Sequence, residues 1–149
     1  MLNNINYLIF TLFNIGKLPA SGTFGSIFTI IFYFVFYNFF SNLIFVIIII
    51  GVLFYSLFFL QKTLSIFSKD DPKEIVIDEF IGQLIPLVIC DGNLLLIFLS
   101  FISFRFFDIL KIYPANIFDK KIKGPIGIIG DDIIAGIYSF IIIYVIKIY

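Results

Sequence analysis

The segment DPKEIVIDEFIGQ, residues 71–83, decides the fold because it brings charge to the start of an apolar run. Four of its thirteen residues are acidic, and the hydrophobic stretch Phe80 to Cys90 follows them directly. Asp71 suits a helix N-cap, and Pro72 suits the first helical turn, where its missing N–H is not needed. We therefore expect a helix from about Pro72 to about Cys90 with its carboxylates at the entrance.

The composition is that of an integral membrane protein. Of the 149 residues, 61% are hydrophobic and the mean hydropathy is +1.13, whereas soluble domains are about 45–50% apolar. The length predicts a single domain over residues 1–149. The net charge is zero, which gives no reason to expect a nucleic-acid partner.

The missing residue types exclude several hydrolytic mechanisms. The chain has no His, so no His nucleophile or His base is available. Its one Cys, Cys90, is followed six residues later by Leu96, where a Cys phosphatase needs an Arg for the phosphate. Hydrolytic chemistry would therefore depend on carboxylates, Lys, Arg, Tyr, Ser and a metal ion.

The apolar runs predict an all-α membrane bundle of about five helices, some of them short or partly interfacial. We expect them at Gly25–Phe40, Leu43–Phe67, Pro72–Cys90, Leu94–Ile112 and from Asp131 to the C-terminus, with a loop from Pro114 to Gly130. With a cytoplasmic N-terminus and five crossings, every basic residue except Lys147 lies on the inner side. The positive-inside rule favours that orientation.

The turn at Asp91 and Gly92 indicates which charges meet. Asp78 precedes Asp91 by thirteen residues, and Arg105 follows Gly92 by thirteen. At 1.5 Å per residue, both lie about 20 Å from the turn, so the antiparallel hairpin brings them together near the cytoplasmic surface. Charges at membrane depth usually face a bundle interior or a water-filled cavity.

Other charged residues are expected at the same surface. Glu74 lies four residues before Asp78 and would share its helical face. Arg105, Asp108 and Lys111 are spaced three apart on the next helix. The pair Asp131–Asp132 would begin the last helix there.

Each of these residues also has a purely structural interpretation. Asp131 could be an N-cap, and Arg105 and Asp108 could form an ion pair. Lys111 could be an interfacial anchor, and Glu74 could be a solvated acid in the first turn. Ala135 and Gly136 could be packing residues. The structural interpretation does not explain the set of acids, because Asp78, Glu79, Asp108, Asp131 and Asp132 would repel one another at one site. A bound Mg²⁺ would relieve that repulsion and leave Arg105 and Lys111 for a phosphate.

Four motifs resemble the phosphatidylglycerophosphatase A family. They are GKLPASGTFGS (16–26), DPKEIVIDEFIGQ (71–83), FRFFDILK (104–111) and GPIGIIGDDIIAG (124–136), and together they cover nearly the whole chain. The sequence departs from the family pattern at Ser21 and Ile112, where the family usually has Pro, and at Gly130, where it has a bulkier residue. None of these departures removes an ionisable group.

The resemblance implies hydrolysis of phosphatidylglycerophosphate to phosphatidylglycerol and phosphate with Mg²⁺ as cofactor, in the bacterial inner membrane. It implies Mg²⁺ binding and water activation by Asp78, Glu79, Asp108, Asp131 and Asp132, and phosphate binding by Arg105 and Lys111, with Glu74 in support. Thr23 and Ser26 would contact the phosphate, although the segment taken by itself favours an ordinary N-cap turn. A phospholipid would be the partner, with no obligate protein partner.

Two other functions are alternatives to a lipid phosphatase. A CDP-alcohol phosphatidyltransferase would need Asp-Gly followed by Ala-Arg and two further spaced Asp residues, which the DGN of residues 91–93 does not provide. A non-enzymatic transport or assembly protein could use the acids as an ion path. Such a path needs ionisable groups near the midplane, and the first two expected helices have none.

Overall fold

The computed structural model describes residues 2–64, 67 and 73–149, and in these ranges the only regular structure is helical. This confirms the all-α prediction. The elements are α1 Leu2–Phe10, η1 Ile15–Lys17, α2 Ser21–Phe36, α3 Asn42–Thr63, α4 Ile77–Leu87, α5 Leu94–Leu110, α6 Ala115–Lys121 and α7 Pro125–Ile148.

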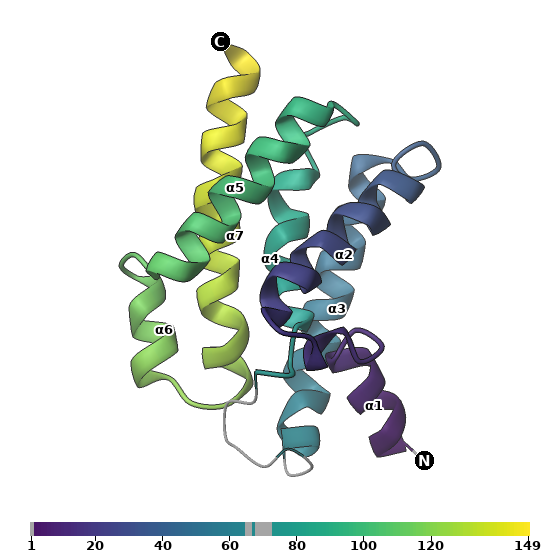
Figure 1. Ribbon diagram of the computed structural model, residues 1–149, viewed down its shortest axis with the longest axis vertical. Coiled ribbons are helices and arrows are strands. Elements are labelled where there is room, and N and C mark those ends of the chain that lie inside the picture. The colour runs from purple at the N-terminus through teal and green to yellow at the C-terminus, as the bar shows by residue number, and fades with distance from the viewer. Residues whose placement is uncertain (1, 65–66, 68–72) are drawn as a thin grey trace.

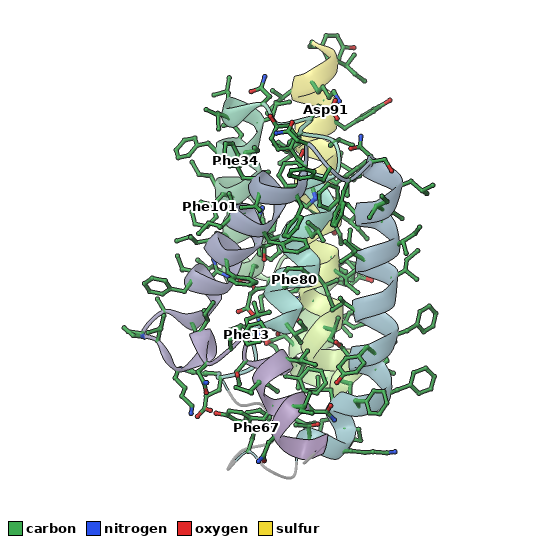
Figure 2. All side chains as sticks on the ribbon, turned by 90° about the vertical axis from the view of Figure 1, so that its right-hand side faces the viewer. Phe13, Phe34, Phe67, Phe80, Asp91 and Phe101 are labelled. Atoms are coloured by element: carbon green, nitrogen blue, oxygen red, sulfur yellow. The ribbon has the colours of Figure 1, made fainter. Side chains whose placement is uncertain are left out.

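The central element is α4, which packs against α2, α3, α5 and α7 (Figure 1). Eight of its eleven residues are buried, as expected for a short helix that is apolar on most sides. Phe80 of α4 is enclosed between the helices, whereas Phe34 of α2 points outward (Figure 2). The core therefore lies around α4, and the outer helices expose apolar side chains.

Glycines allow α4 and α7 to approach each other closely. A Cβ at Gly82 would lie 2.6 Å from the carbonyl oxygen of Asp132, and a Cβ at Gly136 would overlap the carbonyl oxygen of Gly82. The two backbones are therefore in direct contact, as in other small-residue helix pairs. This confirms Gly136 as a packing residue. Gly82 follows Asp78 by one turn, and Gly136 follows Asp132 by one turn, so this contact also brings the two acids together.

Two helices of the described chain are long and apolar enough to cross a membrane. They are α3, with 22 residues, and α7, with 24, which correspond to about 33 and 36 Å. Only 17% of the apolar window of α3 is buried inside the protein, so most of that helix is free to face lipid. A membrane protein is therefore supported, while five full crossings remain a prediction.

The end of the bundle near Asp91 is held together by polar contacts. Lys147 of α7 donates to Asp91 at 2.5 Å and to the carbonyl oxygen of Ile89 at 2.9 Å. Asn42 of α3 donates to the other oxygen of Asp91 at 3.2 Å. Asp91 lies at the opposite end of the molecule from Phe67 (Figure 2).

The start of α4 differs from the prediction. Asp71 and Pro72 lie outside the described residues, but α4 begins only at Ile77. Glu74 lies in a turn, and the N–H of Val76 donates to the carbonyl oxygen of Phe10 at 3.0 Å. This long-range backbone hydrogen bond holds the segment before α4 in a non-helical conformation. The prediction that Glu74 and Asp78 share a helical face is therefore wrong.

The last helix begins earlier than predicted. It starts at Pro125, so Asp131 and Asp132 are its seventh and eighth residues and neither is an N-cap. Pro125 occupies the first helical position, where proline is favoured. The glycines that suggested a loop instead accommodate α6: an added Cβ at Gly127 would meet the carbonyl oxygen of Ile122, and one at Gly130 would meet the ring of Phe118.

The remaining helix ends also shift. The first predicted helix starts at Ser21, four residues before the expected start, and ends at Phe36, so Thr23 lies inside it together with Ser26. The second ends at Thr63. Neither α1 nor α6 was predicted from the sequence.

Candidate metal and phosphate site

One end of the bundle encloses a cavity of about 1430 Å³. The starts of α2, α4 and α7 and the ends of α3, α5 and α6 contribute to its lining. Seven of the ten acids and six of the ten bases of the chain line this cavity. They are Glu74, Asp78, Glu79, Asp108, Asp119, Asp131 and Asp132, with Lys17, Lys73, Arg105, Lys111, Lys120 and Lys123. In so apolar a chain, this concentration of charge marks the candidate functional site.

Three carboxylates converge within the cavity. Asp78 and Glu79 of α4 and Asp132 of α7 each offer an oxygen atom, and these atoms all lie within 4.8 Å of one another. One oxygen of each residue (Oδ1 of Asp78, Oε2 of Glu79 and Oδ2 of Asp132) is buried without a hydrogen-bond partner. Burying an unpaired carboxylate oxygen costs free energy unless a cation binds it. The three residues therefore fit a hard divalent cation, which prefers oxygen ligands.

Gly22 of α2 packs directly on this cluster. A Cβ at this position would overlap the carboxylate of Glu79 and would lie 3.0 Å from one terminal nitrogen of Arg105. Glycine at residue 22 thus lets the backbone of α2 approach both charged groups. Any larger residue would have to displace the Glu79 carboxylate.

Arg105 and Asp108 form an ion pair at the end of α5. Nη1 of Arg105 lies 2.5 Å from Oδ2 of Asp108, and both side chains are largely buried. The Nε atom of Arg105 is buried and has no hydrogen-bond partner. The prediction that this pair could be an ion pair is thus confirmed. Both residues also line the cavity, and the guanidinium has further N–H donors that no described residue uses.

Lys111 lies between two carboxylates. It follows α5 in a left-handed conformation, with φ of 47°, and its amine contacts Asp119 of α6 and Oδ2 of Asp131 of α7, the latter at 2.7 Å. Burial lowers the pKa of Lys111, but the hydrogen bonds to Asp119 and Asp131 outweigh it and raise the pKa above its usual value. Lys111 is therefore a fixed ammonium group at the cavity and not a snorkelling anchor. Two of its three N–H donors are in use, which leaves one.

The other predicted residues divide into two groups. Thr23 and Glu74 line the cavity, and Glu74 accepts a hydrogen bond of 2.6 Å from the hydroxyl of Tyr7. Ser26 is fully buried, donates to the carbonyl oxygen of Gly22 at 2.9 Å, and does not line the cavity. The structure thus gathers nine of the ten predicted site residues and separates Ser26 from them.

Several lining residues were not predicted. Asp119 is the most informative, because it holds Lys111 from a helix that the sequence did not reveal. Lys17, Lys120 and Lys123 also line the cavity. The signal available in the sequence was the charged run DKKIK, residues 119–123, which stands out in an apolar chain but resembles an ordinary polar loop.

Comparison with known proteins agrees with the motifs. The family model described as Phosphatidylglycerophosphatase A matches residues 8–147. A Haemophilus influenzae protein named "Phosphatidylglycerophosphatase A" is 40% identical over 88 residues, which cover 58% of this chain and 54% of that protein. An Escherichia coli K12 protein of the same name is 40% identical over 75 residues, covering 50% and 44%.

A third relative carries a different name. A Bacteroides thetaiotaomicron protein named "Putative phosphatidylinositol-3-phosphatase" is 39% identical over 80 residues, which cover 51% of this chain and 49% of that protein. The chain spans about half the length of the curated relatives it matches. No solved structure matches the chain.

Proposed function

The chain belongs to the phosphatidylglycerophosphatase A family, and from this premise we propose that it is a Mg²⁺-dependent membrane phosphatase. Its proposed reaction is the hydrolysis of phosphatidylglycerophosphate to phosphatidylglycerol and phosphate. The observation that carries the proposal is the convergence of three carboxylates with unpaired buried oxygens in a cavity that Arg105 and Lys111 also line. This combination suits a divalent cation and a phosphate together.

The proposed cation ligands are Asp78, Glu79 and Asp132. A bound Mg²⁺ would neutralise their charge and polarise phosphoryl and water oxygens. Asp108 and Asp131, also predicted as ligands, contact Arg105 and Lys111. We therefore assign them mainly to holding these two bases at the cavity.

Arg105 and Lys111 are the proposed phosphate-binding residues. Arg105 has donors beyond the one that Asp108 uses, and Lys111 has one N–H beyond those directed to Asp119 and Asp131. Fixed positive charge stabilises the charge that develops on phosphoryl oxygens in the transition state. Thr23, which also lines the cavity, is a further proposed phosphate contact.

Hydrolysis forms a bond from a water oxygen to phosphorus and breaks the bond to the glycerol oxygen. The water must lose a proton, and the glycerol oxygen must gain one. We assign the water proton to a cavity carboxylate, and the resulting carboxylic acid would supply a proton to the glycerol oxygen, so that the proton count balances. Oδ1 of Asp131 is a suitable acceptor because it is buried and has no hydrogen-bond partner.

We propose that residues 1–149 form one multi-pass domain of a bacterial inner membrane, with the cavity on the cytoplasmic side. The lengths of α3 and α7 support membrane insertion. Six bases line the cavity, while Lys147 lies at the other end with Asp91, which is the distribution that the positive-inside rule favours. The diacyl tails of the substrate would stay in the bilayer, and no nucleic-acid or obligate protein partner is proposed.

The transport alternative receives less support. An ion path would need ionisable groups along the middle of the spans. In α3 the charged residue is Lys62, next to the helix end, and α7 has no charged residue between Asp132 and Lys147. The charge of α3 thus lies next to its end, and the two acids of α7 lie about two turns from its start.

The test is phosphate release by the purified full-length protein from lipid in detergent micelles. We expect turnover of phosphatidylglycerophosphate with Mg²⁺, loss of turnover in excess EDTA, and recovery when Mg²⁺ is restored. Undiminished turnover in EDTA would exclude the metal role. Phosphatidylinositol 3-phosphate should be assayed in parallel because of the Bacteroides relative. Release from that lipid alone would reassign the substrate.

A further inference from the structure

The cavity contains more positive charge than its ion pairs use. Among the described residues, Arg105 and Lys111 form the cavity's salt bridges, with Asp108, Asp119 and Asp131. Lys17, Lys73, Lys120 and Lys123 also line the cavity, and none of them forms a salt bridge with a described carboxylate. These lysines therefore remain available for an anion that the protein itself does not supply, and we consider the three that lie on η1, on α6 and between α6 and α7, namely Lys17, Lys120 and Lys123.

The three lysines come from different segments of the cavity lining, and all three are exposed. Lys17 ends η1, and its ammonium lies over the ring of Tyr7, 5.2 Å from the centroid. Lys120 is in the last turn of α6, and Lys123 lies in the connection to α7. In Figure 1, η1 and α6 lie on two sides of the start of α7, although residues of both line the same cavity.

We propose that Lys17, Lys120 and Lys123 form a second anion subsite, which binds the phosphodiester of a phospholipid whose terminal phosphomonoester lies at Arg105 and Lys111. This inference rests on the proposed phosphatase function and specifies its substrate class. Lysine suits a singly charged phosphodiester, because its ammonium acts as a mobile point charge, whereas the planar guanidinium of Arg105 suits a phosphate presenting two oxygens.

The size of the cavity agrees with a ligand bearing two phosphates. Sites for drug-sized ligands occupy about 300–1,000 Å³, and this cavity has about 1430 Å³. A single phosphate would leave most of that space and the three lysines unused. A head group with a phosphodiester and a terminal phosphate would occupy both charged regions.

The subsite predicts discrimination between two lipids. Phosphatidylglycerophosphate carries both a phosphomonoester and a phosphodiester, whereas phosphatidic acid carries only the phosphomonoester. The subsite therefore increases kcat/KM for the first lipid relative to the second. General attraction of lysines to an anionic surface would also favour the more highly charged phosphatidylglycerophosphate, but it would depend equally on lysines inside and outside the cavity.

Helix α6 offers a matched pair of variants for the test. Lys120 and Lys121 are adjacent, exposed and equally charged, but only Lys120 lines the cavity. Full-length Lys120→Gln and Lys121→Gln proteins would be assayed with Mg²⁺ in zwitterionic micelles, each lipid at the same surface fraction. We expect Lys120→Gln to lower the ratio of kcat/KM for phosphatidylglycerophosphate over phosphatidic acid about tenfold, as for a lost charged hydrogen bond. Lys121→Gln should leave the ratio unchanged.

A second measurement does not depend on turnover of phosphatidic acid. Phosphatidylglycerol carries the phosphodiester alone, so it should inhibit competitively, and Lys120→Gln and Lys17→Gln should each weaken that inhibition. Lys120→Arg should restore it. Three outcomes would overturn the subsite while leaving the phosphatase proposal intact. They are an equal loss of kcat/KM on both lipids, an equal effect of Lys121→Gln, and the absence of inhibition by phosphatidylglycerol. Failure of the unmodified protein to release phosphate from phosphatidylglycerophosphate would instead overturn the proposed function.

Discussion

Replacing Gly82 with alanine tests whether the contact between α4 and α7 positions the carboxylates. The added methyl carbon would lie 2.6 Å from the carbonyl oxygen of Asp132 and 2.6 Å from a ring carbon of Phe104, whereas ordinary contact begins at 3.4 Å. The carbonyl belongs to the backbone of α7 and cannot rotate away. α4 and α7 must therefore separate by most of an ångström, and the ring of Phe104 on α5 must also shift.

Two opposing effects determine the change in stability. Overpacking in a well-packed interior costs about 1–3 kcal/mol, and replacing glycine by alanine within a helix returns up to about 1 kcal/mol. We expect a net loss of about 0–3 kcal/mol in the free energy of unfolding. The effect on turnover should be larger, because misplacing a reacting group by about 1 Å can cost about 10²-fold in rate.

The assay measures melting temperature and phosphate release on the same detergent samples. Gly51→Ala is the matched control, since nothing lies within 4 Å of a Cβ there. This control should keep full activity and gain slightly in stability. If Gly82→Ala folds and retains wild-type turnover, the close approach of α4 and α7 does not position the acids.

Three further substitutions probe the site. In Gly22→Ala the added methyl group would contact the flexible carboxylate of Glu79 and no backbone atom. The melting temperature should therefore change little, while the Mg²⁺ concentration for half-maximal activity should rise. An unchanged Mg²⁺ titration would contradict this expectation. Asp78→Asn should lose on the order of 10²-fold in turnover while remaining folded, whereas Asp91→Asn, at the other end of the bundle, should stay active; equal activity of the two would misplace the site. Arg105→Lys keeps the charge but loses the planar fork, which should cost about 1–3 kcal/mol in transition-state binding; lower melting with preserved specific activity would make Arg105 a purely structural partner.

The sequence predicted which charges meet, because helix geometry and a turn suffice for that inference. Asp78 and Arg105 are equally distant from the turn at Asp91 and Gly92, and both line the cavity. The prediction needed only the rise per residue and an antiparallel hairpin. Small errors in the helix ends did not affect it, because the turn fixed the register.

The features that were not predicted depend on contacts between distant residues. Glu74 is non-helical because the following segment bonds to Phe10, far away in the chain. Gly127 and Gly130 resemble loop residues, but they lie in α7 and make room for α6. The role of Asp119 depends on α6, whose seven residues are too few to show a helical period.

The spacing of four residues between an acid and a glycine limits where residues can be inserted into or deleted from this chain. Asp78 and Gly82 in α4 have the same spacing as Asp132 and Gly136 in α7. Inserting one residue in either interval would turn the acid relative to its glycine by about 100° and shift it by about 1.5 Å along the axis. The acid and its glycine would then face different neighbours. Insertions and deletions should therefore be excluded from these two helical turns.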